Sequence, residues 1–125
     1  MEAIVDTSVV IEIAKDNRSV IEQLERFRGW KFYITTINNF ELKVGVLSER
    51  ERVIIDALPK LAFDERASNI AAELFKDLKA KGKTPKLKDL FVASIALANN
   101  MPLITCDRDF LIFREKGLNV YCLEV

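Results

Sequence analysis

A short apolar run near the C-terminus ends in two acidic residues one position apart: residues 103–110 read LITCDRDF, and the acids are Asp107 and Asp109. Acids are common in turns and at helix caps, so this pair alone indicates no particular chemistry. A second apolar run, residues 3–5, ends directly in Asp6. In open parallel sheets, ligands bind outside the carboxyl ends of the strands, where the connections change direction. If the two runs form neighbouring strands, Asp6 and Asp107 emerge side by side at that edge.

Two more acids, Glu41 and Asp89, stand in otherwise apolar helical segments, where an unpaired carboxylate is costly. Taken singly, each has a simpler explanation, because charged side chains usually reach water and an acid in the first turn of a helix suits the helix dipole. Taken with Asp6 and Asp107, they make four like charges that repel one another at one sheet edge. Carboxylate oxygens and water are the ligands that suit Mg²⁺ and Mn²⁺, so the pattern predicts a site for such a cation.

The composition excludes several other kinds of site. The 125-residue chain has no histidine, which rules out histidine-dependent triads, imidazole general bases and the common zinc sites. Its two cysteines, Cys106 and Cys122, both lie in predicted strands, and we expect buried thiols rather than a disulfide framework. Lysine plus arginine balances aspartate plus glutamate at 19 each, so the net charge favours no nucleic-acid partner.

Length and hydropathy predict one soluble domain over residues 1–125, and 50% of its residues are hydrophobic, which is enough for a sizeable core. No run approaches the roughly 20 apolar residues of a membrane span, and the N-terminus lacks the basic region of a signal peptide. We therefore expect a cytoplasmic protein with no membrane partner.

Strand-like runs alternate with helical patterns along the whole chain. The predicted strands are residues 2–6, 31–35, 61–63, 101–106 and 119–125. The predicted helices are residues 8–14, 19–27, 37–46, 48–58, 64–82, 87–98 and 109–117. Such alternation produces right-handed crossovers and a mainly parallel sheet that is covered on both faces. The predicted fold class is α/β, with three α/β/α layers and a mainly parallel central sheet of four or five strands.

Three segments together resemble a known family. They read IVDTSVVIE at residues 4–12, ITTINNFELKVGV at 34–46 and KGKTPKLKDLFVASIALANNMPLITCDRDF at 81–110. In this order and spacing they resemble the PIN-domain ribonucleases, and among them the VapC-type toxins of toxin–antitoxin pairs, over nearly the whole chain. One departure is conservative: Val92 and Ala93 fill places where the family more often has isoleucine and alanine.

The resemblance implies roles for individual residues. The metal-binding catalytic acids would be Asp6, Glu41, Asp89 and Asp107, with Asp109 as an accessory acid. Thr7, Ser8 and Thr105 would form hydrogen bonds to these acids. Ordinary helix capping and turn formation also explain the presence of these three residues. We expect Asp6, Asp89 and Asp107 to be the principal ligands. Whether Glu41 binds the metal directly or orients the attacking water stays open.

The implied activity is the hydrolysis of RNA phosphodiesters with one or two Mg²⁺ or Mn²⁺ ions. Basic residues near the acids could contact the RNA backbone, namely Lys83, Lys86, Lys88 and Arg108. A solvated helix end and a surface salt bridge explain the same residues.

The resemblance also implies two protein partners: a second copy in a homodimer, and a cognate antitoxin that covers the active site. Apolar residues on the early helices could supply these surfaces or could belong to the core. They are Val10, Ile13, Phe27 and Trp30.

Two other function classes fit part of the pattern. A PIN-like scaffold that binds RNA or protein without catalysis is the nearer one, and the intact set of acids argues against it. A phosphoacceptor receiver domain shares the α/β plan, but it needs an aspartate ending a middle strand and a lysine ending a late strand. Residues 61–63 lead into Asp64 at a predicted helix cap, and residues 119–125 contain no lysine.

Overall fold

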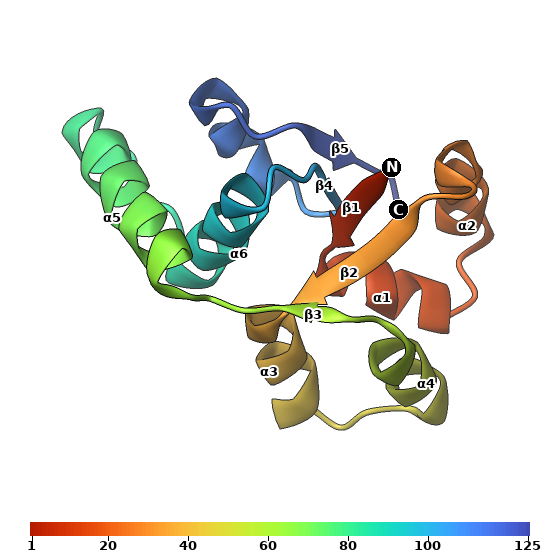
Figure 1. Ribbon diagram of the computed structural model, residues 1–125. Coiled ribbons are helices and arrows are strands. Elements are labelled where there is room, and N and C mark those ends of the chain that lie inside the picture. Colours follow the sequence, from red (N-terminus) through yellow and green to blue (C-terminus); the bar gives the residue numbers. More distant parts are fainter.

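Five parallel strands form the centre of the molecule in the computed structural model, which describes residues 1–125 (Figure 1). The strands are β1 (Glu2–Val5), β2 (Lys31–Thr35), β3 (Lys60–Leu61), β4 (Leu103–Thr105) and β5 (Val120–Cys122). Their order in the sheet is β3-β2-β1-β4-β5, and every neighbouring pair is parallel. The chain moves from β1 to β2 and β3 on one side and later to β4 and β5 on the other. The winding therefore reverses at the β1–β4 pair.

Helices cover both faces of this sheet, which confirms the predicted three-layer α/β fold (Figure 1). One face carries α1 (Thr7–Ala14), α2 (Arg18–Leu24), η1 (Glu25–Phe27) and α4 (Glu49–Ala57). The other face carries α5 (Glu65–Ala80), α6 (Leu87–Ala98) and η2 (Arg108–Lys116). Helix α3 (Thr36–Val44) follows β2 directly and lies at the carboxyl edge of the sheet (Figure 1). No helix combines the length and the apolar character that crossing a bilayer requires.

The central strands are apolar on both faces because they separate two cores. Ile4 and Leu103 pack against α5, α6 and η2, whereas Ala3, Val5 and Ile104 pack on the side of α1, α2 and α4. All five side chains are at most 5% exposed. The alternation follows from the two-residue period of a strand, and it explains why β1 and β4 read as continuous apolar runs.

The structure corrects several predicted boundaries. The helix predicted over residues 19–27 is divided into α2 and the 3-10 turn η1, and this tighter turn brings Phe27 into the core against Trp30 and Tyr121, with ring centroids 5.0 Å away in each case. The short helix predicted over residues 109–117 is the 3-10 helix η2, which covers Arg108–Lys116 and has Gly117 as its C-cap.

Three strands are shorter than predicted. Strand β3 covers Lys60–Leu61 instead of residues 61–63, because only these residues pair with the end of β2. Strands β4 and β5 are limited to the three residues of each that pair with one another, Leu103–Thr105 with Val120–Cys122.

The two cysteines differ from the prediction. Cys106 lies just after β4, Cys122 ends β5, and both are free and half-buried rather than fully buried. Partial burial raises the pKa of the Cys106 thiol to about 11, so this thiol is protonated and unreactive at neutral pH.

Candidate metal centre

The carboxyl ends of β1 and β4 bring two of the predicted acids to one edge of the sheet. Val5 pairs with Ile104 in parallel register, and the backbone amide of Asp6 donates to the carbonyl of Ile104 at 2.9 Å. Asp6 then caps α1, and Asp107 caps η2. Both acids stand where the winding of the sheet reverses, which is the usual place for a ligand in such a fold.

Two hydroxyl groups tie the ends of these strands to the Asp6 carboxylate. Ser8 Oγ donates to Asp6 Oδ2 at 2.8 Å and accepts from the amide of Cys106 at 2.9 Å. Thr105 Oγ1 donates to the same Asp6 oxygen at 3.1 Å and accepts from the amide of Asp107 at 2.9 Å. Each hydroxyl therefore links the β1 end to the segment that carries Asp107.

Asn38 completes the surroundings of Asp6, and the sequence analysis missed it. This fully buried residue donates through Nδ2 to Asp6 Oδ1 at 3.1 Å and to Thr7 Oγ1 at 3.0 Å. Its Oδ1 accepts from the hydroxyl of Thr35 at 2.7 Å and from the Thr35 amide at 3.2 Å. The spacing of Thr35 and Asn38 is that of a capping box, a signal in the sequence that could have identified Asn38 as a fixed group.

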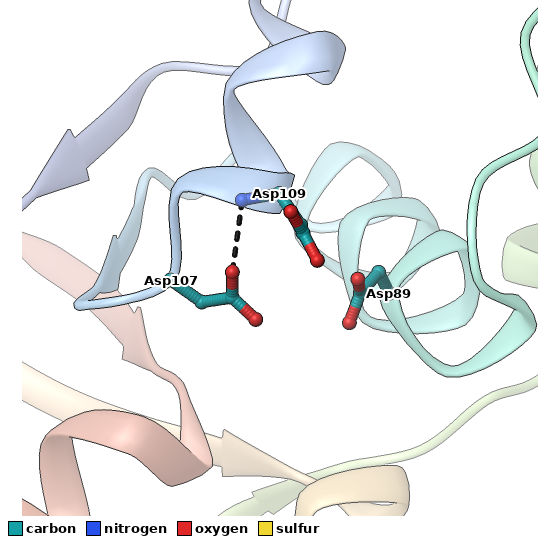
Figure 2. A group of neighbouring side chains, drawn as sticks. All are labelled: Asp89, Asp107 and Asp109. Atoms are coloured by element: carbon teal, nitrogen blue, oxygen red, sulfur yellow. Dashed lines mark hydrogen bonds between the residues drawn. The ribbon is translucent and has the colours of Figure 1, made fainter.

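Three aspartates form a group that could hold a metal ion, and we call it the aspartate trio. Asp89, Asp107 and Asp109 each offer one carboxylate oxygen, and these oxygens lie within 4.8 Å of one another. Figure 2 shows Asp89 on α6 facing Asp107 and Asp109 at the start of η2. The Asp109 amide donates to Asp107 Oδ1 at 2.8 Å, which holds the Asp107 carboxylate in place. Asp6, expected as a principal ligand, and Glu41, for which direct metal binding was left open, lie outside this trio, and Asp109, expected as accessory, lies inside it.

Asp89 is the acid whose surroundings fit a cation best. It is 2% exposed, and its Oδ1 has no hydrogen-bond partner. Burial raises the pKa of Asp89 from 3.8 to about 6; the charge of Lys88 opposes this increase, and the charges of Asp107 and Asp6 add to it. A buried carboxylate without a partner is costly, and a hard divalent cation bound to the trio would remove that cost.

Glu41 reaches the site from α3 but faces a lysine. Lys88 Nζ lies 2.8 Å from Glu41 Oε2 and 3.7 Å from Asp89 Oδ1. The other Glu41 oxygen, Oε1, is buried without a hydrogen-bond partner. Glu41 is therefore not part of the trio, and Lys88 contacts both Glu41 and Asp89.

Of the other three basic residues predicted to contact RNA, two lie beside the trio and one does not. Lys86 Nζ lies 3.0 Å from Asp109 Oδ2, and its side chain is 71% exposed. Arg108 forms no ion pair and lines, together with Lys86 and Asp89, a polar hollow of about 380 Å³. Lys83 pairs instead with Glu115 at 3.1 Å, near the C-terminal end of η2, whereas Asp107 and Asp109 lie at its N-terminal end.

The chain matches a known family along most of its length. The family model of the PIN domain matches residues 3–116. The protein "Ribonuclease VapC3" of Methanocaldococcus jannaschii is 47% identical over 95 residues, which are 76% of this chain and 98% of that one. The "Plasmid stability protein StbB" of Pseudomonas syringae is 31% identical over 133 aligned positions, which cover 94% of each chain.

Solved structures show the same fold. The VapBC2 structure from Rickettsia felis contains a chain that superposes with a TM-score of 0.82 at 23% identity, over 99% of this chain and 100% of that one. The VapBC-1 structure from nontypeable Haemophilus influenzae gives a TM-score of 0.78 at 19% identity, over 98% of each chain.

Proposed function

The chain belongs to the PIN-domain family, and from this premise we propose that it is a divalent-metal-dependent endoribonuclease, the toxin of a toxin–antitoxin pair. The observation that carries the proposal is the aspartate trio, in which the buried Asp89 has an oxygen without a hydrogen-bond partner. The relative from M. jannaschii, named a ribonuclease, supports RNA as the substrate. Such an enzyme would act in the cytoplasm, where its RNA targets are.

The residues of the trio would hold Mg²⁺ or Mn²⁺. Bound there, the ion would lower the pKa of a coordinated water and stabilise negative charge on the scissile phosphate. Asp6, which accepts hydrogen bonds from Ser8, Thr105 and Asn38, adds a fixed negative charge beside the trio. Lys86 and Arg108 line the polar hollow next to Asp89, and they would contact RNA phosphates there.

A scaffold without catalysis is the competing proposal, and it predicts a different use of the same acids. A scaffold that only binds RNA gains nothing from buried carboxylates, because they repel phosphate and raise the cost of folding. The buried carboxylate of Asp89 therefore favours a nuclease over a scaffold.

The first prediction concerns cleavage of circular RNA, which has no ends and is opened only by an endonuclease. We expect the purified protein to linearise it with Mn²⁺ or Mg²⁺ and to leave it intact with a chelator. Asp107→Asn removes one charge of the trio, and we expect the rate to fall by at least about a hundredfold, since ligand groups supply several kcal/mol through the metal.

Asp77→Asn is the matched control, because Asp77 is an exposed acid of α5 that pairs with Lys116 at 3.5 Å. It should cut like the unmodified protein. RNA that is bound in chelator but never cut with metal would favour the scaffold, and equal cutting by Asp107→Asn would remove the trio from the mechanism.

We further propose that the antitoxin binds the apolar groove between α1, α2 and α4. This groove has a volume of about 460 Å³, and 9 of its 12 lining residues are hydrophobic. Val10 and Phe27 are buried at its floor, whereas Ile13 is half-exposed on its wall. These residues and Trp30 were expected either to supply a partner surface or to belong to the core, and Trp30 is half-buried beside Phe27 and does not line the groove. An apolar groove of this kind suits one face of an amphipathic helix.

The second prediction tests this groove. Ile13→Glu should weaken binding of the protein encoded by the neighbouring reading frame by at least about tenfold, because it places a charge in a desolvated contact. Calorimetric titration of the purified pair measures the affinity. Val53→Glu is the control, since Val53 is an apolar residue of α4 that is 60% exposed and does not line the groove. Unchanged affinity of the Ile13 variant would place the antitoxin elsewhere.

We also propose a homodimer formed through the exposed apolar end of α3. Phe40 and Val44 are 67% and 68% exposed, and Leu87 at the start of α6 is 58% exposed. Phe40, Val44 and the half-buried Phe91 line a mostly apolar hollow of about 370 Å³, which Glu41 and Lys88 also border. Apolar surface of this kind usually marks a contact with another chain.

The third prediction concerns the mass of the particle in solution. The unmodified protein should sediment as a dimer, and Val44→Glu should sediment as a monomer because the substitution charges the contact. Val53→Glu again serves as the control and should remain dimeric. A monomeric unmodified protein, or a dimer that survives Val44→Glu, would contradict the proposal.

A further inference from the structure

Lys88 holds an unusual position among the basic residues of the chain. Its ammonium group lies 2.8 Å from Glu41 Oε2 and 3.7 Å from Asp89 Oδ1, and no other ion-paired cation of the chain contacts two acids. Its side chain is 36% exposed, compared with 71% for Lys86 and 43% for Lys83. Lys88 is therefore a component of the acidic site rather than a solvated lysine beside it.

The arrangement resembles that of two cations sharing one carboxylate. Asp89 faces Asp107 and Asp109 (Figure 2), and its Oδ1 also lies 3.7 Å from Lys88 Nζ. In sites with two metal ions, the ions are about 3.5–4 Å apart and are held by carboxylates that include shared ones. A second ion at this position would need Glu41 and Asp89 as ligands. The ammonium group of Lys88 already contacts both of these acids.

We propose that Lys88 is a built-in cation that takes the place of a second divalent ion, so that the chain binds one divalent ion, at the aspartate trio. Glu41 is then a positioning residue that holds Lys88 and not a metal ligand. The catalytic role of Lys88 rests on the proposed function: Lys88 stabilises negative charge on the scissile phosphate.

The contacts of Lys88 hold its ammonium group against two acids. Nζ lies 2.8 Å from Glu41 Oε2 and 3.7 Å from Asp89 Oδ1, so it occupies the space beside carboxylate oxygens that a second divalent ion would need. Its flexible stem also lets the ammonium group follow a phosphate oxygen that approaches Asp89.

The experiment is a calorimetric titration of the full chain with Mn²⁺. We expect the unmodified protein to bind one ion per chain. Lys88→Ala removes both the charge and the bulk, and it should bind two ions per chain. Lys83→Ala, which removes a lysine paired with Glu115 outside the site, should bind one. Two ions bound by the unmodified protein would overturn the proposal without any variant, and so would one ion bound by a folded Lys88→Ala.

Two further variants test the role of Glu41. Glu41→Gln should leave the affinity for Mn²⁺ within about twofold of the unmodified protein, whereas Asp107→Asn should lower it by at least about tenfold, as loss of a ligand does. An equal decrease for both would make Glu41 a ligand and overturn the proposal.

Cleavage of RNA separates this inference from the proposed function. Lys88→Met fills the space without the charge, so it should keep one bound ion while its kcat falls and its KM changes little. If the unmodified protein binds one ion, Lys88→Ala binds two and neither cuts RNA, the proposed function is wrong and the cation assignment stands. If the unmodified protein cuts RNA with two bound ions, the proposed function stands and the assignment of Lys88 is wrong.

Discussion

Asp89→Asn is expected to stabilise the metal-free protein and to abolish RNA cleavage. Asp89 is 2% exposed, and burial raises its pKa from 3.8 to about 6. At pH 7 the ionised carboxylate therefore costs the folded state on the order of 3 kcal/mol, at about 1.4 kcal/mol per pKa unit. Asparagine is uncharged, so it removes the repulsion with the neighbouring carboxylates of Asp107 and Asp109, whose oxygens lie within 4.8 Å. The same substitution removes the central charge of the trio, and we expect cleavage to fall by about a thousandfold or more.

The pH dependence of stability tests whether the buried charge of Asp89 destabilises the metal-free protein. Because the folded protein binds the Asp89 proton more tightly than the unfolded chain, this group's contribution to stability is full below about pH 4 and is lost as the pH rises through about 6. Urea unfolding in chelator should therefore show the free energy of unfolding of the unmodified protein decreasing over this range. Asp89→Asn should lack that decrease, whereas Asp77→Asn, at an exposed position, should keep it. A variant less stable than the unmodified protein at pH 7 would show that Asp89 is already well satisfied without a cation.

Asn38→Ala is expected to destabilise the fold by about 3 kcal/mol and to lower cleavage. The substitution removes four hydrogen bonds of buried groups on Asp6, Thr7 and Thr35, one of them a carboxylate, and the Thr35 hydroxyl keeps only its bond from the backbone amide of residue 38. Each buried group left unsatisfied costs about 1–3 kcal/mol, and relaxation recovers part of the total. Asp6 also loses the donor that orients its Oδ1, so its charge is no longer fixed beside the trio.

Asn39→Ala is the matched control for Asn38→Ala. Asn39 is the next residue of α3, and its Oδ1 is buried without a hydrogen-bond partner, so its removal should change the free energy of unfolding by less than about 1 kcal/mol. Chemical denaturation measures both variants, and cleavage of circular RNA at a temperature where both are folded measures activity. Equal effects of the two substitutions would mean that the Asn38 hydrogen bonds do not hold Asp6.

Much of the fold and part of the site could be predicted from local patterns. Apolar runs that end in Asp6 and Asp107 indicated strands with acids at their carboxyl ends, because a buried parallel strand needs apolar residues on both faces. The alternation with helices predicted the layered sheet, and the resemblance to the PIN-domain family is confirmed by the family match over residues 3–116. Boundaries were less certain, as the shortened β4 and β5 show, because strand length depends on the partner's ladder.

Tertiary structure alone decided how the acids are divided among their partners. Asp109 joins Asp89 and Asp107, while Asp6 is enclosed by Ser8, Thr105 and Asn38, and these groupings join residues up to 99 positions apart. The same holds for Lys88, which the sequence indicated only as one of several lysines and which the packing of α3 against α6 places on Glu41.

The strand-and-helix order, the absence of histidine chemistry and the acids at the strand ends follow from residue type and short-range periodicity. Three-dimensional packing sets which carboxylates face one another, which of them contact a lysine and which oxygens have no hydrogen-bond partner. The physical reason is that charge interactions and burial depend on distances between atoms across the fold, and the spacing of residues along the chain does not set those distances.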